Sequence, residues 1–253
     1  MHRFYLPPEQ TQSAILTLTD GEAHHAADVL RLRPGERVVV LNGAGYEFLC
    51  EITGLSGDCV TLAVKNKVFI QPLPYRLTLV QAVPKGKTMD LIVQKATELG
   101  ADRIVPVLSE RTVAQVSEES ASAKVEKWRG TAIEAIKQCG SAWLPQIDSP
   151  LSPAGFLARE EKSDLALIAT LRNNARHPRS YFTTFQAEHQ RLPKSVCVWV
   201  GPEGDFTPAE INAVASSGAL PVTLGQLILR SETAAIYCLA VLNYELQAPP
   251  HGG

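Results

Sequence analysis

The chain has 253 residues, a formal net charge of −2, and 45% hydrophobic and 20% charged residues. This composition is typical of a globular protein, and the length allows one large domain or two smaller ones, each with its own core. A charge so close to zero gives no general attraction to nucleic acid, so an RNA partner would have to bind at a local basic patch.

The cysteines and the apolar segments narrow the class of protein further. Five cysteines are scattered along the chain and are never spaced as CxxC. This argues against a zinc site or a disulfide framework and predicts reduced, buried thiols in a cytoplasmic protein. The longest apolar run, residues 234–242, is too short to span a bilayer, and the first ten residues lack the apolar core of a signal peptide. We therefore expect no membrane partner and no metal ion.

Residues 1–72 predict a small β domain. A helix at 21–30 comes first, and its adjacent histidines, His24 and His25, point to different faces, which does not suggest a metal pair. Turn-forming residues then separate three β-rich runs, which is typical of hairpins in a small sheet or barrel. These runs are 37–41, 46–52 and 59–64. Prolines at 71–74 indicate a linker.

A second domain is predicted at 75–247, where apolar strands alternate with helices. The predicted strands are 77–83, 103–108, 165–170, 196–200 and 220–224. Thr88 is the predicted N-cap of a helix that ends at Gly100, and further helices are expected at 124–138 and 232–246. Alternation of this kind, with nearly continuous apolar strands, predicts a parallel sheet covered on both faces.

Two of these strands end in glycine turns. Strand 196–200 leads into Gly-Pro-Glu-Gly at 201–204, and a helix follows with Thr207 and Glu210 spaced as a capping box. Strand 220–224 likewise leads into a glycine turn and then the last helix. Strand ends at the carboxyl edge of a parallel sheet form a crevice in which ligands bind. The sequence therefore predicts a small-molecule site here.

The common phosphate-binding motifs do not fit this chain. The run Gly86-Lys87-Thr88 ends like a P-loop, but Gln81 stands where that motif needs its first glycine, and no GxGxxG follows a strand. The turn at 201–205 contains a proline, which lacks an N–H donor, and two carboxylates, which repel anions. A cationic or neutral ligand fits better. The turn chemistry alone equally allows glycines that only make tight turns.

Several motifs together resemble one family, the RsmE-type 16S ribosomal RNA uridine-N3 methyltransferases of the SPOUT superfamily. The resemblance covers nearly the whole chain, with the motifs in order. They are HxxxVLR at 25–31, GAG at 43–45, KGxxMDxIxxKxTELG at 85–100, SER at 109–111, GPEGDF at 201–206 and LGxxILRxETA at 224–234.

The resemblance implies a fold, a cofactor and partners. The N-terminal domain would be a PUA-like β-barrel that helps to bind RNA. The C-terminal domain would be an α/β domain with a trefoil knot that forms a pocket for S-adenosylmethionine. The protein would act as a homodimer and methylate N3 of one uridine in the decoding region of 16S rRNA in the small ribosomal subunit.

The same resemblance assigns site residues by position. Those expected to bind the cofactor are Leu171, Gly201, Glu203, Gly204, Leu224, Gly225, Ile228, Leu229 and Arg230. Two departures affect this assignment. Asp205 replaces the usual glycine after GPEG, and Ser141 stands where the family has an arginine. If that arginine contacts RNA, this chain replaces the contact elsewhere.

Catalysis requires negative charge on the uracil to be stabilised after N3 loses its proton. Arg230 is the candidate catalytic residue, because it lies between a strand and a helix N-terminus. The alternative is a salt bridge from Arg230 to Glu232 or Glu203 that only holds the loop. No residue is singled out as the general base.

RNA-binding candidates are basic residues that follow strand ends or lie in the N-terminal domain, although each alone also fits a solvated surface charge. They are Arg31, Arg33, Lys85, Lys87 and Arg111. Two other functions stay open at this point. One is a non-catalytic RNA-binding protein of ribosome assembly, and the other is a methyltransferase of the same superfamily that acts on transfer RNA or on a ribose oxygen.

Overall fold

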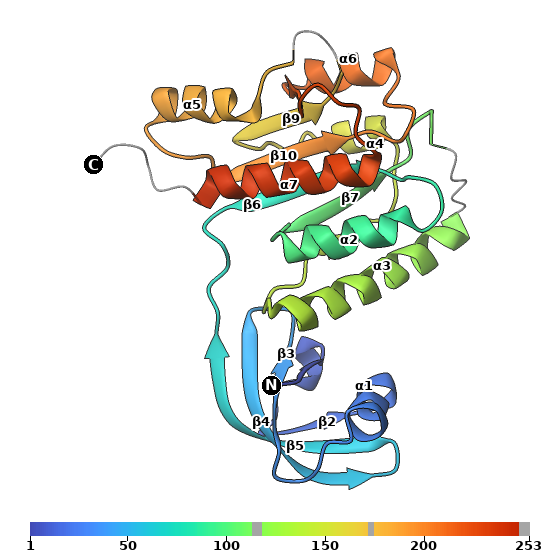
Figure 1. Ribbon diagram of the computed structural model, residues 1–253, viewed down its shortest axis with the longest axis vertical. Coiled ribbons are helices and arrows are strands. Elements are labelled where there is room, and N and C mark those ends of the chain that lie inside the picture. The colour runs from blue at the N-terminus through green and yellow to red at the C-terminus, as the bar shows by residue number, and fades with distance from the viewer. Residues whose placement is uncertain (113–117, 172–174, 248–253) are drawn as a thin grey trace. The chain divides into compact units, whose positions relative to one another are not determined.

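The computed structural model describes residues 1–112, 118–171 and 175–247 (Figure 1). The chain forms two compact units. The first unit consists of Met1–Pro72 together with Ile133–Leu144, and the second consists of Leu73–Ala132 together with the chain from Pro145 onward. The division falls within one helix, α3 (Glu118–Cys139), so this helix contributes to both units.

The first unit is built on a five-stranded sheet in the order β1-β3-β4-β5-β2. Its strands are β1 (Arg3–Tyr5), β2 (Ile15–Leu18), β3 (Arg37–Leu41), β4 (Tyr46–Ser56) and β5 (Cys59–Phe69). The pair β1–β3 is parallel and the other pairs are antiparallel. The predicted hairpin strands are confirmed, and β4 and β5 extend further than predicted. Two register shifts in this hairpin act as bulges and increase its twist.

The helix predicted at 21–30 is present as α1 (Asp20–His24), followed by a π-helical turn at His25–Val29. The two adjacent histidines have different neighbours, as expected. His24 Nδ1 lies 2.8 Å from a carboxylate oxygen of Asp28, whereas the ring of His25 meets the ring of Phe4 edge to face.

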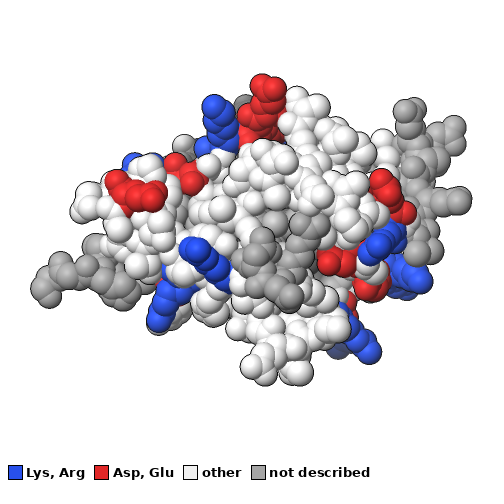
Figure 2. Space-filling view, turned by 90° about the horizontal axis from the view of Figure 1, so that it is seen from above, with Lys and Arg blue, Asp and Glu red and all other residues white. Residues whose placement is uncertain are grey.

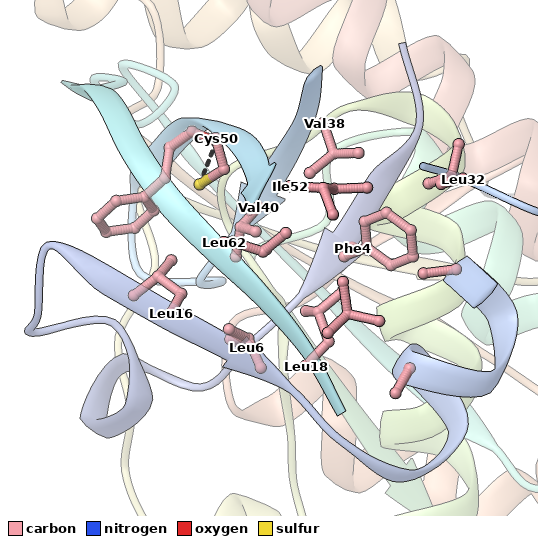
Figure 3. Close-up of a cluster of buried hydrophobic side chains, with 14 residues drawn as sticks. Phe4, Leu6, Leu16, Leu18, Leu32, Val38, Val40, Cys50, Ile52 and Leu62 are labelled. Atoms are coloured by element: carbon pink, nitrogen blue, oxygen red, sulfur yellow. Dashed lines mark hydrogen bonds between the residues drawn. The ribbon is translucent and has the colours of Figure 1, made fainter. Parts of the chain in front are cut away.

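The core of the first unit is a cluster of apolar side chains that point inward from alternate strand positions (Figure 3). Phe4 from β1, Leu18 from β2, Val38 and Val40 from β3 and Ile52 from β4 are all buried there. β2 alternates between buried and exposed positions, whereas in β3 every residue from Val38 to Leu41 is buried. Apolar side chains from several strands thus form one shared core that stabilises the sheet.

Three of the five cysteines behave as small core residues, and burial raises the pKa of the Cys50 thiol to about 11 and that of Cys197 and Cys238 to about 12. All five are free thiols, as predicted. The prediction that all are buried is wrong for Cys59 and Cys139, which are exposed. Both lie at ends of elements, Cys59 at the start of β5 and Cys139 at the end of α3.

The end of α3 is bound to the first unit by polar contacts. The Arg3 guanidinium donates to the carbonyl oxygens of Lys137 and Gln138, each at 3.3 Å, where the helix leaves carbonyls without partners. Lys137 Nζ donates to carboxylates of Glu22 and Glu134, both at 2.8 Å. Gly140, with φ +80, follows the helix in the left-handed conformation that commonly ends one.

The second unit contains a six-stranded, fully parallel sheet in the order β11-β9-β10-β6-β7-β8. Its strands are β6 (Arg76–Ala82), β7 (Arg103–Val107), β8 (Gln146–Ile147), β9 (Leu165–Ala169), β10 (Ser195–Val200) and β11 (Leu220–Val222). The predicted parallel sheet is confirmed. β11 ends two residues earlier than predicted because Thr223 turns the chain, its Oγ1 accepting a hydrogen bond from Gly225 N at 3.3 Å.

Helices cover both faces of this sheet. On one face Phe156, Ile211 and Val214, from the helices α4 and α6, pack around Trp199 of β10. On the other, α7 packs on β10 and β6, and α2 runs beside α7 (Figure 1). The helices are α2 (Thr88–Glu98), α4 (Pro153–Leu157), α5 (Pro178–His189), α6 (Pro208–Ser216) and α7 (Ser231–Gln247). None of the described helices is long and apolar enough to cross a membrane.

Thr88 is not the N-cap of α2, so this prediction is wrong. Thr88 is the first residue of the helix and Lys87 is the cap, without a side-chain cap hydrogen bond. The lysine side chain has no acceptor for a backbone N–H, and Lys87, with φ −97 and ψ 6, also lacks the extended backbone of a usual N-cap. Gly86, with φ +66, leads the chain directly into this tight turn.

Candidate functional site

A cavity lies at the carboxyl edge of the parallel sheet. Three segments line it, at 169–171, 200–205 and 224–234. They follow β9, β10 and β11, so three strand ends meet where the sequence predicted a crevice.

The structure brings together seven of the nine residues predicted to bind the cofactor. Those lining the cavity are Leu171, Gly201, Glu203, Leu224, Gly225, Ile228 and Leu229. The other two, Gly204 and Arg230, are next to lining residues but do not line the cavity themselves. Sequence reasoning missed further lining residues, among them Thr170, Asp205 and Ser231. Asp205 and Ser231 lie inside the motifs at 201–206 and 224–234, and Thr170 directly precedes Leu171. Their place in the chain next to predicted site residues was the available signal.

The first wall is the turn after β10, and it needs glycine at 201. A Cβ at Gly201 would lie 3.2 Å from Phe206 N and 3.0 Å from Asp205 Oδ1. Asp205, which replaces the usual glycine, has φ +59, and its Oδ1 accepts a hydrogen bond from Phe206 N at 2.7 Å. Aspartate tolerates this left-handed conformation better than most residues. The turn is therefore retained despite the substitution.

The helix after this turn starts with the predicted capping box, which the structure confirms. Thr207 Oγ1 accepts from Glu210 N at 3.3 Å, and Glu210 Oε2 accepts from Thr207 N at 2.8 Å. The other carboxylate oxygen of Glu210 accepts from Glu110 N at 2.9 Å. One carboxylate thus caps α6 and also holds the loop that follows β7.

Two further hydrogen bonds join loops at this edge. Lys85 N donates to Glu203 Oε1 at 3.1 Å, and Arg111 Nη1 donates to the Gly204 carbonyl at 2.7 Å. Lys85, Lys87 and Arg111 are exposed and lie on the loops after β6 and β7, at the same edge of the sheet as the cavity. The other two predicted RNA-binding residues, Arg31 and Arg33, are exposed residues of the first unit.

The second wall is the turn between β11 and α7. Its apolar side chains are unusually open to solvent, since Leu227 is 77% and Ile228 is 82% exposed. Ser231, the first residue of α7, donates from Oγ to the Gly201 carbonyl at 2.7 Å and so joins the two walls. Arg230 is exposed. Within the described residues, no salt bridge links it to Glu203 or Glu232.

Charge at the cavity is negative and sparse. Among the lining residues, the charged side chains are the carboxylates of Glu203 and Asp205, and the remainder of the lining is mostly apolar. On the face drawn in Figure 2, acidic and basic side chains are scattered, with uncharged surface between them. Such a cavity suits a ligand with apolar surface and positive rather than negative charge.

The described part of the chain contains no group of three or more His, Cys, Asp or Glu residues arranged to hold a metal ion. The cavity walls instead offer backbone carbonyls, amides and hydroxyls. These groups orient an organic ligand through hydrogen bonds.

Comparison with sequence families gives two matches. Residues 71–243 match the family described as RNA methyltransferase domain, and residues 18–65 match the RNA methyltransferase PUA domain. With the parallel sheet and its cavity, these matches define an RNA methyltransferase that carries a PUA domain.

Curated relatives narrow the class to one family. The chain is 33% identical over 249 residues to ribosomal RNA small subunit methyltransferase E of Synechocystis, covering 98% of this chain and 78% of that protein. It is 29% identical over 255 residues to the Bacillus subtilis protein of the same name, covering 98% of both. The chain therefore belongs to the ribosomal RNA small subunit methyltransferase E family, as the sequence motifs predicted.

Solved structures share the fold. A methyltransferase from Legionella pneumophila in complex with SAM superposes with a TM-score of 0.86, at 32% identity and with 96% of each chain covered. Ribosomal RNA small subunit methyltransferase E from Neisseria gonorrhoeae, bound to S-adenosyl methionine, gives a TM-score of 0.82 at 27% identity, covering 96% of this chain and 97% of that one. The predicted fold class, an α/β domain with a parallel sheet plus a PUA-like β domain, is confirmed.

Proposed function

We propose that this protein transfers a methyl group from S-adenosylmethionine to N3 of one uridine in the decoding region of 16S rRNA. The observation that carries the proposal is the cavity at the carboxyl edge of the sheet, which gathers residues of both glycine-turn motifs. Relatives of the same family are named for methylation of small-subunit rRNA, and two similar structures hold SAM.

The cavity has the chemistry that this cofactor requires. Leu224, Ile228 and Leu229 provide apolar surface for the adenine ring. The carboxylates of Glu203 and Asp205 provide negative charge for a ligand whose sulfonium group is positive. When bound, the cofactor supplies an electrophilic methyl group. The trefoil knot implied by the family resemblance is part of this proposal as the architecture of the pocket.

Arg230 is the residue proposed to stabilise the reacting uracil. Its side chain is exposed, and it precedes α7, whose N-terminus carries partial positive charge. Loss of the N3 proton to solvent places negative charge on N3, O2 and O4, and a guanidinium beside these atoms lowers the barrier to methyl transfer. The N3 lone pair then bonds to the methyl carbon while the bond from that carbon to the sulfonium sulfur breaks, so the products are N3-methyluridine and S-adenosylhomocysteine.

RNA is proposed to bind through both domains, the PUA-like domain at 1–72 and the methyltransferase domain at 75–247. Lys85 and Lys87 extend from the loop beside the cavity, and Arg31 and Arg33 belong to the PUA-like domain. Arg111 has a second task, because its guanidinium already donates to Gly204. Contacts to phosphates release counterions, so we expect binding to weaken steeply as the salt concentration rises.

The protein is further proposed to act as a cytoplasmic homodimer. Tyr237 and Tyr244 on α7 are 41% and 68% exposed, and they line an open groove. The other residues of the groove are His177, Arg179, Ala240, Val241 and Glu245. Exposed aromatic side chains beside apolar ones are common in subunit interfaces. Light scattering should give twice the chain mass, and a monomer at micromolar concentration would exclude the dimer.

The test of the function is methyl transfer to defined RNA. Purified protein with labelled S-adenosylmethionine is incubated with small ribosomal subunits, naked 16S rRNA and transfer RNA. We expect label in the small-subunit RNA and a stop in reverse transcription at one uridine, because an N3 methyl group blocks Watson–Crick pairing. Label in transfer RNA, or at a ribose oxygen, would favour another activity of the superfamily. Binding of rRNA without transfer would favour a non-catalytic assembly role.

A further inference from the structure

Gln81 is a buried polar side chain that the proposed chemistry leaves unexplained. It is 0% exposed and lies near the carboxyl end of β6. Its Nε2 donates two hydrogen bonds, one to the Ala82 carbonyl at 2.8 Å and one to Ser231 Oγ at 3.0 Å. Its Oε1 is buried without a hydrogen-bond partner among the described residues, and a polar group of this size is costly to bury unless its hydrogen bonds are needed.

The first hydrogen bond compensates for a proline. Arg76 N donates to the carbonyl of Lys194, and the ladder continues with Gln81 opposite Val200. The ladder ends at this pair, and continued by one step it would place the N–H of residue 202 opposite the Ala82 carbonyl. That residue is Pro202, which has no N–H to donate. Gln81 Nε2 therefore satisfies a strand-end carbonyl that the ladder leaves without a donor.

The second hydrogen bond reaches the walls of the cavity. Ser231 is 4% exposed, and its Oγ accepts from Gln81 and donates to the Gly201 carbonyl at 2.7 Å. Gly201 and Ser231 both line the cavity. Gln81, Ser231 and Gly201 thus form a chain of hydrogen bonds from the buried strand β6 to the two turns that face the ligand. Arg230 is covalently next to the central member of this chain.

We propose that Gln81 is a positioning residue of the cofactor site, and that it acts through Ser231 to fix the Gly201 turn against the start of α7. This inference rests on the proposed function, because the ligand whose binding it controls is S-adenosylmethionine. Fixing the two turns before the ligand arrives lowers the entropy lost on binding. It also fixes the backbone at the start of α7, directly after Arg230.

Three variants and one control test this role. Gln81→Met keeps the length of the side chain and removes both donors. Ser231→Ala removes the central hydroxyl, whereas Ser231→Thr retains one. Thr97→Val is the control, because Thr97 is 4% exposed and its Oγ1 donates to Val93 O at 2.8 Å within α2, without lining the cavity. The control thus loses a buried hydroxyl of similar exposure that joins no loops.

Calorimetric titration with S-adenosylmethionine is combined with thermal unfolding and with the kcat of methyl transfer. We expect Gln81→Met and Ser231→Ala each to weaken cofactor binding about tenfold, the effect of losing one well-formed hydrogen bond to a buried partner. Because both break the same chain, the double variant should be far less than 100-fold weaker. Ser231→Thr should restore most of the affinity. Thr97→Val should lower the unfolding temperature and leave the dissociation constant unchanged.

Two results would overturn the inference. One is a lowered unfolding temperature in Gln81→Met and Ser231→Ala with cofactor affinity and kcat as in the control, which would make their role merely structural. The other is a double variant whose loss equals the product of the single losses, which would make the two side chains independent. If Gln81→Met fails to fold, the inference is tested by comparing the cofactor affinities of Ser231→Ala and Ser231→Thr. A wild-type protein that binds no cofactor would instead refute the proposed function.

Discussion

The two edges of the parallel sheet in the second unit are built from different interactions. At the carboxyl edge, side chains hold the backbone of neighbouring loops, as Ser231 holds Gly201 and Arg111 holds Gly204. At the amino edge, charged side chains hold one another. Arg103 donates to Asp148 at 2.6 Å and to Glu161 at 2.5 Å.

The amino edge therefore contributes mainly to the stability of the fold, and the carboxyl edge to ligand binding. At the amino edge the carboxylate of Asp148 is buried and also accepts from Arg159 at 2.6 Å, so its charge is compensated within the protein. At the carboxyl edge Glu203 and Asp205 accept hydrogen bonds from backbone amides and face the cavity. Their charge remains available to a cationic ligand. The following substitutions test this separation, and the largest expected effect comes first.

Replacing Arg230 by Ala should reduce the rate of methyl transfer by about 10²–10³-fold, the usual loss when a donor to a developing anion is removed. Binding of S-adenosylmethionine should stay close to that of the wild type, because Arg230 does not line the cavity. Single-turnover kinetics and calorimetry measure the two quantities. Arg230→Lys is the matched variant that keeps the charge. Equal losses of rate and of cofactor binding would mean that Arg230 only holds the loop.

Gly201→Val should weaken cofactor binding by about 100-fold, because the added side chain overpacks the first wall at a cost of about 3 kcal/mol. The added side chain would collide with Phe206 N and Asp205 Oδ1. Gly130→Ala in α3 is the control, because a Cβ there meets no atom within 4 Å. It should leave binding unchanged and favour the helix slightly. Wild-type affinity in Gly201→Val would place the cofactor elsewhere.

Asp148→Asn should lower the free energy of unfolding by about 2 kcal/mol, because it leaves the partly buried Arg103 with weaker partners. Urea unfolding measures this change. Although burial alone would raise the pKa of Asp148, hydrogen bonds from Arg103 and Arg159 lower it. Cofactor affinity should not change, since the residue belongs to the amino edge. A matching loss of affinity would show that the two edges are coupled.

The smallest effect concerns acid stability. A hydrogen bond from Arg191 lowers the pKa of Asp164 from 3.8 to about 2. A carboxylate with a lowered pKa in the folded state contributes stability above the pKa of its unfolded form, and that contribution is lost as the pH falls. For Asp164 this window runs from 3.8 down to about 2. The free energies of unfolding of Asp164→Asn and of the wild type, each measured as a function of pH, should converge as the pH falls through this window. A constant difference between the two proteins over this pH range would contradict the lowered pKa of Asp164.

Much of the site was predictable from sequence because it is built from local motifs. Glycine turns after apolar strands mark 201–204 and 224–225, and parallel strands bring such turns to one edge. The role of Gln81 was not predictable. It depends on a contact with Ser231, which is 150 positions away in the chain. No periodicity reports a contact of that kind.

The fold shows the same limit. Elements such as α3 and β4 were predicted, whereas the twelve-residue helix α5 and the strands β1 and β2, of three and four residues, were missed. Such short strands carry little pattern of their own and are defined by their partners, β1 by β3 and β2 by β5. Thr88 is another case, because whether a threonine caps a helix depends on backbone angles that Gly86 changes.

The most direct test of the central claim is calorimetric titration of the wild-type protein and of Gly201→Val with S-adenosylmethionine and S-adenosylhomocysteine. We predict one site per chain for both ligands in the wild type. We also predict tighter binding of the sulfonium compound, because Glu203 and Asp205 face the cavity, and a loss of about 100-fold in the variant. Absence of binding to the wild type, with or without RNA, would contradict the assignment of this cavity as a cofactor site.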